Sequence, residues 1–186
     1  HAKKDGRNSL RFFDPTMQAV LVERSALESD LRYALERQEL RLYYQIQVNR
    51  ARRVIGAEAL LRWEHPGRGL VSPDQFIPLA EETGLILPIG LWVLQTACAQ
   101  IKAWSGNPAT SKLQLAVNVS PRQFRQPDFV DQVQQALSAT GINPARLKIE
   151  LTESMALDNL GDTVTKMRAL ITQGVSLAMD DFGTGY

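Results

Sequence analysis

With 186 residues, 44% of them hydrophobic and 22% charged, the chain has the size and composition of one soluble globular domain. Its formal net charge of +1 argues against polymeric nucleic acid as a partner, and its single cysteine, Cys98, excludes an internal disulfide and fits a reducing compartment. No apolar run reaches the ~18 residues that a membrane span requires. We therefore expect a cytoplasmic segment without membrane contact, whose parent protein could carry an anchor elsewhere.

The N-terminal part of the chain is expected to link this domain to another one. Residues 1–13 are basic and polar and begin without a methionine, which is typical of the tail of an upstream domain. Asp14 and Pro15 then form a helix-start signal, a capping acceptor followed by proline. The residues after it carry apolar side chains at helical spacing: Val20, Leu27, Leu31, Ala34 and Leu35. We predict a linker helix over residues 14–38.

The next segment is expected to form a β-hairpin. Residues 40–48 alternate between apolar and polar side chains, residues 49–53 are polar and turn-like, and residues 54–63 form a second alternating run. On the second strand, Glu58 and Arg62 share one face because side chains alternate with a period of two. Residues 65–69 are predicted to be a loop.

From residue 73 onwards helices and strands alternate. We predict helices over residues 73–83, 87–104 and 155–173 and one that ends near Thr140, and strands over residues 113–119, 147–151 and 175–180. Cys98 falls within the second of these helices and is expected to be a packed core thiol. This alternation is typical of parallel βαβ units and therefore predicts an α/β fold.

Polar side chains end three successive predicted strands. Asn118, Glu150 and Asp180 each lie on the strand face that carries small or polar residues, and Glu58 lies on such a face of an earlier strand. Any one of them alone is more often an ordinary surface residue. Because the carboxyl ends of parallel strands meet at one edge of a sheet, four in phase indicate a shared site. Their oxygen atoms suit Mg²⁺, Mn²⁺ or Ca²⁺ rather than zinc.

The adjacent carboxylates of Asp180 and Asp181 indicate more than a helix cap, because two carboxylates side by side repel each other without a proton or cation between them. One of them could bridge two metal ions about 3.5–4 Å apart, the arrangement that supports in-line hydrolysis of a phosphoester. Arg62, about 13 Å beyond Glu58 along its strand, is within reach of a phosphate.

Four short motifs in order resemble the signatures of EAL domains, which are cyclic di-GMP phosphodiesterases. The motifs are EALLRW at residues 58–63, AVNVS around Asn118, ELTES at residues 150–154 and DDFGTG at residues 180–185. The resemblance runs from about Leu31 to Tyr186 and implies a TIM-like (β/α)8 barrel with an antiparallel first strand. Residues 39–186 would be the N-terminal part of that domain, and residues 1–13 are similar to the C-terminal tail of a GGDEF domain.

The resemblance implies a role for each matching residue. Metal binding would fall to Glu58, Asn118, Glu150, Asp180 and Asp181, with two Mg²⁺ or Mn²⁺ ions in the intact domain. The catalytic residues would be Glu58, Asp180, Asp181 and Glu153, and Glu153 would hold the loop at residues 182–186. The dinucleotide would be contacted by Gln45, Leu61 and Arg62. The reaction would be metal-dependent hydrolysis of cyclic di-GMP to linear pGpG.

The chain departs from the family pattern in two places. Ile46 follows Gln45 where family members usually carry proline, which alters local rigidity. The chain also stops soon after its fifth predicted strand, so the barrel is expected to be incomplete in it. The fragment alone is then expected to be inactive, and its open strand edge could support a homodimer. The alternative function is a non-catalytic EAL-like receptor that binds cyclic di-GMP without cleaving it.

Overall fold

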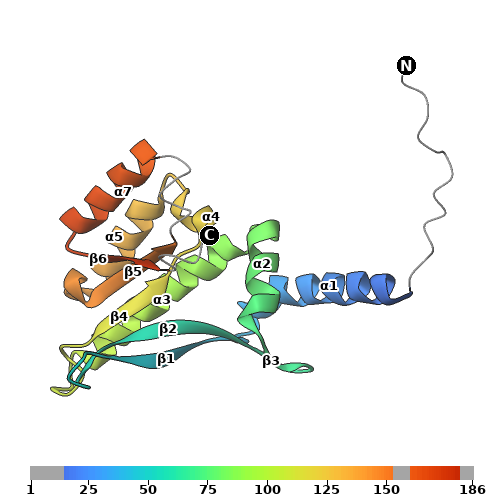
Figure 1. Cartoon of the computed structure of the whole chain (residues 1–186), viewed down its shortest axis with the longest axis horizontal. Helices are drawn as coiled ribbons and strands as arrows, with labels where there is room; N and C mark the ends of the chain where they lie inside the picture. Colours follow the sequence, from blue (N-terminus) through green and yellow to red (C-terminus); the bar gives the residue numbers. More distant parts are fainter. Residues whose placement is uncertain (1–14, 153–159, 181–186) are drawn as a thin grey trace.

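The computed structural model describes residues 15–152 and 160–180, and the side chains of residues 18–152 and 160–179. Its centre is a six-stranded sheet in which five strands follow the order β1-β2-β4-β5-β6 and a short β3 pairs with β2 (Figure 1). β2, β4, β5 and β6 are parallel, and β1 is antiparallel to β2. The predicted α/β fold with an antiparallel first strand is therefore confirmed.

The sheet opens with the predicted hairpin. β1 (Leu40–Val48) and β2 (Val54–His65) pair in a register that sets Gln45 opposite Glu58. The tip is fixed by Asn49, whose side-chain oxygen accepts hydrogen bonds from the backbone N–H groups of Ala51 and Arg53, both at 3.0 Å. This Asx turn explains why a polar stretch connects two alternating runs.

The loop predicted at residues 65–69 is partly wrong. β2 extends to His65, and β3 (Gly69–Val71) pairs with its end. The ring of His65 stabilises the turn between these strands, because Nδ1 accepts hydrogen bonds from the N–H groups of Gly67 and Arg68 at 3.0 and 3.1 Å. A three-residue strand that starts at a glycine with positive φ has too short an alternation to be recognised in a sequence.

The first helix, α1 (Pro15–Ala34), confirms the predicted helix but ends four residues earlier. Its C-terminal half packs against the body through the buried side chains of Leu27, Leu31 and Ala34. Its N-terminal half projects away from the sheet (Figure 1), and Val20, which the spacing assigned to the apolar face, is 63% exposed. The role of this helix as a link between domains stays a prediction.

Two helices follow the hairpin and build the core. α2 (Pro73–Thr83) ends at Gly84 in the left-handed conformation, as its sequence predicts. α3 (Ile86–Trp104) is long and apolar enough, by length and composition, to cross a membrane. In this fold it lies against the sheet, and it buries Ile89, Leu94 and Cys98 almost completely. Its apolar composition is explained by this central position.

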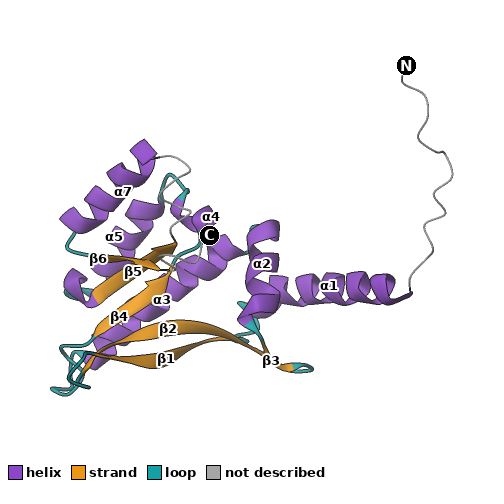
Figure 2. Ribbon diagram, in the orientation of Figure 1, coloured by secondary structure: helices purple, strands orange, loops and turns teal. Residues whose placement is uncertain are grey.

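The rest of the chain repeats strand and helix. The elements are β4 (Gln114–Asn118), α4 (Pro121–Phe124), α5 (Phe129–Thr140), a 3₁₀ turn η1 (Pro144–Arg146), β5 (Leu147–Thr152), α7 (Leu160–Thr172) and β6 (Ser176–Asp180). Figure 2 shows α3, α5 and α7 together on one side of the sheet. Leu115, Val117 and Ile149 are buried and join the core with α3. The opposite face of these strands carries the polar residues of the predicted site.

Candidate functional site

A hydrogen bond joins two of the predicted metal ligands across the sheet. Nδ2 of Asn118, the last residue of β4, donates to Oε1 of Glu58 on β2 at 2.7 Å. The two residues are 60 positions apart in the sequence, and parallel pairing of Gly56–Ala59 with Gln114–Val117 brings their strands together. The structure thus places Glu58 and Asn118 in contact, on the sheet face opposite the core helices.

Strand register places the third predicted ligand beside them. Asn118 is the direct partner of Glu150 in the β4–β5 ladder, and Glu150 is half-buried on β5. Neighbouring strands lie about 4.8 Å apart, so these side chains rise from adjacent backbone positions. Three residues that sequence analysis predicted to share a site are therefore grouped at one edge of the sheet.

The fourth predicted ligand is described only by its backbone. Asp180 ends β6 and pairs with Thr152 of β5, two residues beyond Glu150. Because side chains alternate along a strand, positions 150 and 152 share a face of β5. The side chain of Asp180 and the whole of Asp181 and Glu153 lie outside the described residues. Their predicted roles stay predictions.

The residues present fit a hard divalent cation by their chemistry. Among the described side chains, no three His, Cys, Asp or Glu residues form a metal-binding group. Of the expected carboxylates, the described set holds Glu58 and Glu150. Together with the Asn118 carboxamide, these groups present oxygen atoms and neither sulfur nor imidazole, which matches the preference of Mg²⁺ or Mn²⁺.

The hairpin carries a second polar group on the same face as Glu58. Gln45 is the register partner of Glu58, and Arg62 lies four residues further along β2. The guanidinium carbon of Arg62 is 5.9 Å from the centre of the Tyr43 ring, a cation–π contact, and Arg62 Nη1 donates to the carbonyl of Leu61 at 2.9 Å. The arginine that was predicted to contact phosphate is therefore supported from beneath by an aromatic ring.

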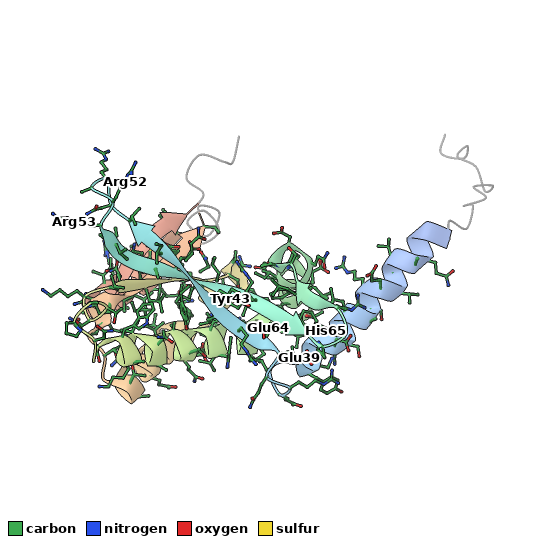
Figure 3. All side chains as sticks on the ribbon, turned by 90° about the horizontal axis from the view of Figure 1, so that it is seen from below. Glu39, Tyr43, Arg52, Arg53, Glu64 and His65 are labelled. Carbon is green, nitrogen blue, oxygen red and sulfur yellow. The ribbon has the colours of Figure 1, made fainter. Side chains whose placement is uncertain are left out.

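Tyr43 is in turn held by Glu64. Its hydroxyl donates to Oε1 of Glu64 at 3.0 Å, and Nε of Arg41 is 3.5 Å from Oε2 of the same carboxylate (Figure 3). This hydrogen bond, followed by the negative charge of Glu64, raises the pKa of Tyr43 above its ordinary value, so the phenol stays protonated at neutral pH. Sequence analysis did not select Tyr43 or Glu64; the alternation of β1 and β2, aligned through the turn, was the signal that could have found them.

Leu61 does not lie with the other predicted substrate contacts. It pairs with Leu42 and is partly buried against the hydrophobic core, on the face opposite Glu58 and Arg62. The residue of this motif on the Glu58 face is Leu60, the register partner of Tyr43. The structure thus groups Gln45 and Arg62 with the predicted metal ligands and separates Leu61 from them.

The arrangement defines a class of protein: an α/β sheet with an antiparallel first strand that carries the oxygen-bearing side chains of Glu58, Asn118 and Glu150 on one face. The EAL domain family matches residues 28–186. The chain therefore belongs to the EAL domain family. The solved EAL structures that it resembles are TIM-barrel-like, and the chain covers only part of that domain.

Three relatives illustrate the similarity. The chain is 46% identical over 187 residues to the "Bifunctional diguanylate cyclase/cyclic di-GMP phosphodiesterase MucR" of Pseudomonas aeruginosa. This alignment covers 100% of this chain and 27% of MucR. It is 37% identical over 188 residues to "Cyclic di-GMP phosphodiesterase NbdA" of the same organism, in an alignment that covers 100% of this chain and 24% of NbdA. The chain thus spans about a quarter of the length of these relatives.

The third relative is a solved structure. It is described as "PaMucR Phosphodiesterase, c-di-GMP complex" and superimposes with a TM-score of 0.82 at 46% identity. The match covers 87% of this chain and 65% of that one. The similarity therefore includes most of the described residues, and the predicted incomplete barrel is consistent with the remaining third of the solved domain.

Proposed function

We propose that the intact parent protein hydrolyses cyclic di-GMP to linear pGpG at this edge of the sheet, with Mg²⁺ or Mn²⁺ as cofactor. The observation that carries the proposal is the hydrogen bond from Asn118 to Glu58, with Glu150 as the register neighbour of Asn118. The names of MucR and NbdA, both phosphodiesterases of cyclic di-GMP, support the choice of substrate. Because the chain spans about a quarter of those proteins, the activity is proposed for the intact protein and not for the fragment.

The charge of the site explains why cations are needed. Glu58 and Glu150 present carboxylates where an anionic phosphodiester would bind, and like charges repel each other at close range. Divalent cations held by these residues, with Asn118, Asp180 and Asp181, would remove this repulsion. When bound, such ions lower the pKa of water and offset the negative charge that develops on the phosphate.

The residues of the hairpin have a separate task, which is to hold the substrate. Arg62 can form two parallel hydrogen bonds with a phosphate, and the Tyr43 ring beneath it restricts the directions that its guanidinium can take. Gln45, the register partner of Glu58, offers an amide that can donate and accept at the sheet edge. Binding energy at these positions would orient the phosphodiester for hydrolysis.

The region before the EAL domain is proposed to connect it to a GGDEF domain. The MucR alignment spans all of this chain, including the residues that precede position 28, and MucR is named as bifunctional. In this proposal residues 1–13 are the tail of a GGDEF domain and α1 is the link. Ion pairs of α1 with the body, Glu23 with Arg68 at 3.2 Å and Arg24 with Glu82, would fix the helix relative to the EAL domain.

The decisive experiment uses the intact protein with cyclic di-GMP and Mg²⁺ or Mn²⁺, and follows pGpG by chromatography. We expect hydrolysis by the wild type and a loss of more than about 100-fold in Glu150→Gln, since even indirect partners of a metal typically contribute 10–100-fold. The matched control is Asp131→Asn, which also converts a carboxylate to an amide but on the exposed face of α5, and which should retain full activity. Binding of cyclic di-GMP without hydrolysis by the wild type would contradict the proposal and identify a receptor.

A further inference from the structure

The end of the sheet opposite the predicted site collects positive charge. The parallel strands β2, β4, β5 and β6 all begin at this end, so the segments that precede them lie together there. We call the face formed by residues 46–56, 100–114, 141–148 and 173–176 the underside. The underside contains the hairpin tip, the end of α3 with the loop after it, and η1 (Figure 1).

The underside is uniformly cationic at its rim. These segments contain no Asp or Glu, and they carry seven basic side chains: Arg50, Arg52, Arg53, Lys102, Lys112, Arg146 and Lys148. All of these except the half-buried Arg146 and Lys148 are exposed. The formal net charge of the whole chain is +1. The near-neutral total therefore conceals a positive underside, with the carboxylates gathered elsewhere, including at the predicted site.

Contacts between the loops hold this face together. Arg146 donates to the carbonyl of Lys112, and Nε2 of Gln114 donates to the carbonyl of Ala145 at 3.0 Å and to Oγ of Ser176 at 2.8 Å. The hairpin tip is preset by the hydrogen bonds of the Asn49 side chain. Arg52 and Arg53 extend outward from this tip (Figure 3). The basic side chains therefore extend from loops that are already structured, so binding does not have to order these loops.

Aliphatic side chains are exposed beside the arginines. The exposed fractions of Ile46, Val48, Val54 and Ile55 lie between 46% and 67%. The four segments contain one aromatic residue, Trp104, and its ring packs edge-on against Tyr44 with ring centres 5.5 Å apart. A surface that combines arginines with aliphatic side chains, and offers no exposed ring on which a base could stack, suits a lipid interface better than a nucleic acid.

We infer that the underside is a docking surface for an anionic lipid bilayer. Arginine binds phosphate headgroups through two donors at once, and the aliphatic side chains of the hairpin tip can enter the interface between headgroups and acyl chains. The predicted site lies at the other end of the strands and stays open to solvent in this orientation. The expectation of no membrane contact rested on the lack of a spanning apolar run, and docking at a membrane surface does not require such a run.

The test is co-sedimentation of the intact protein with vesicles of phosphatidylcholine, with and without phosphatidylglycerol. We expect binding only to the vesicles that contain phosphatidylglycerol, and weaker binding as salt is added. The triple variant R50Q/R52Q/R53Q should lose about 100-fold in affinity, since each basic residue near an anionic surface contributes roughly fivefold. The variant R24Q/R32Q/R37Q removes the same charge from α1 and the turn after it, and should bind like the wild type.

Two results would overturn the inference. One is equal loss of vesicle binding in the two triple variants, which would show a dependence on net charge and not on the underside. The other combines two observations: the doubly substituted V54S/I55S variant binds vesicles as tightly as the wild type, and a single-stranded oligonucleotide competes fully with the vesicles. Together they would identify nucleic acid as the ligand. Circular dichroism of each variant establishes that the fold is retained. None of these readouts depends on hydrolysis of cyclic di-GMP.

Discussion

Asn118 donates a hydrogen bond of 2.7 Å to Glu58, and this bond joins the last residue of β4 to the N-terminal half of β2. The bond fixes one oxygen of a carboxylate that is proposed to hold a cation. We expect Asn118→Ala in the intact protein to raise the metal concentration for half-maximal hydrolysis of cyclic di-GMP by about 10–100-fold. Titration of Mn²⁺ against the rate of pGpG formation measures this, and an unchanged metal requirement would exclude the proposed role of Asn118.

The variant Asn118→Asp tests the same contact through pH. It replaces the donor beside Glu58 with a second carboxylate, and two close carboxylates raise the pKa of one of them. The acidic limb of the pH–rate profile should therefore move to higher pH than in the wild type, because the site must lose that proton before it holds a cation. An acidic limb at its original position would show that the two side chains do not interact in the active protein.

Tyr43 is expected to act through Arg62. Removal of the ring in Tyr43→Leu should raise the KM for cyclic di-GMP two- to fivefold with little change in kcat, since an exposed cation–π contact contributes about 0.5–1 kcal/mol. In an Arg62→Ala background the same substitution should have no further effect. Tyr33→Leu is the matched control, because Tyr33 of α1 is also exposed (44%) and also forms a cation–π contact, with Arg37, away from the predicted site. Additive effects of the substitutions at Tyr43 and Arg62 would contradict this coupling.

The sequence was sufficient to predict the parts of the fold that depend on periodicity. The hairpin of β1 and β2, the end of α2 at Gly84 and the grouping of Glu58, Asn118 and Glu150 are all as predicted, because alternation and strand direction determine them. Cys98 is buried as expected.

Other features depend on pairing between distant segments, which no local pattern reports. The short β3 exists because it pairs with the end of β2, and Val20 is exposed because α1 extends beyond the body that would cover it. Strand parity places Leu61 on the face opposite Glu58, and Leu60 is the leucine of this motif on the Glu58 face, so the predicted contact of Leu61 with the substrate stays a prediction. The positive underside was concealed because the net charge sums over both ends of the sheet.

The close approach of β2 and β4 predicts a large effect for one small substitution. A Cβ atom at Gly56 would lie 2.5 Å from the backbone carbonyl oxygen of Gln114, and this oxygen cannot move without distorting the ladder. We expect Gly56→Ala to lower the free energy of unfolding by about 1–3 kcal/mol. The control is Gly161→Ala in α7, where none of the described atoms outside the local helix backbone lies within 4 Å of the added Cβ; this variant should be neutral or stabilising by up to about 1 kcal/mol. Urea unfolding of both variants measures the difference, and equal stabilities would show that β2 and β4 can separate freely.

Burial of Cys98 predicts how stability depends on alkaline pH. Burial raises the pKa of the Cys98 thiol from 9.0 to about 11, since the thiolate is poorly solvated in the core beneath α3. The unfolded thiol ionises first, so the unfolded chain holds fewer protons between these values and the free energy of unfolding falls as pH rises through them. The free energy of unfolding of the wild type, measured relative to that of Cys98→Ala, should fall by up to about 2–3 kcal/mol across that window. Because both proteins contain the same tyrosines and lysines, the comparison removes the contributions of these residues. Urea unfolding at a series of pH values measures it.

A thiol reagent should label Cys98 only in the presence of denaturant, and rapid labelling of the native chain would show that the core around α3 is open to solvent.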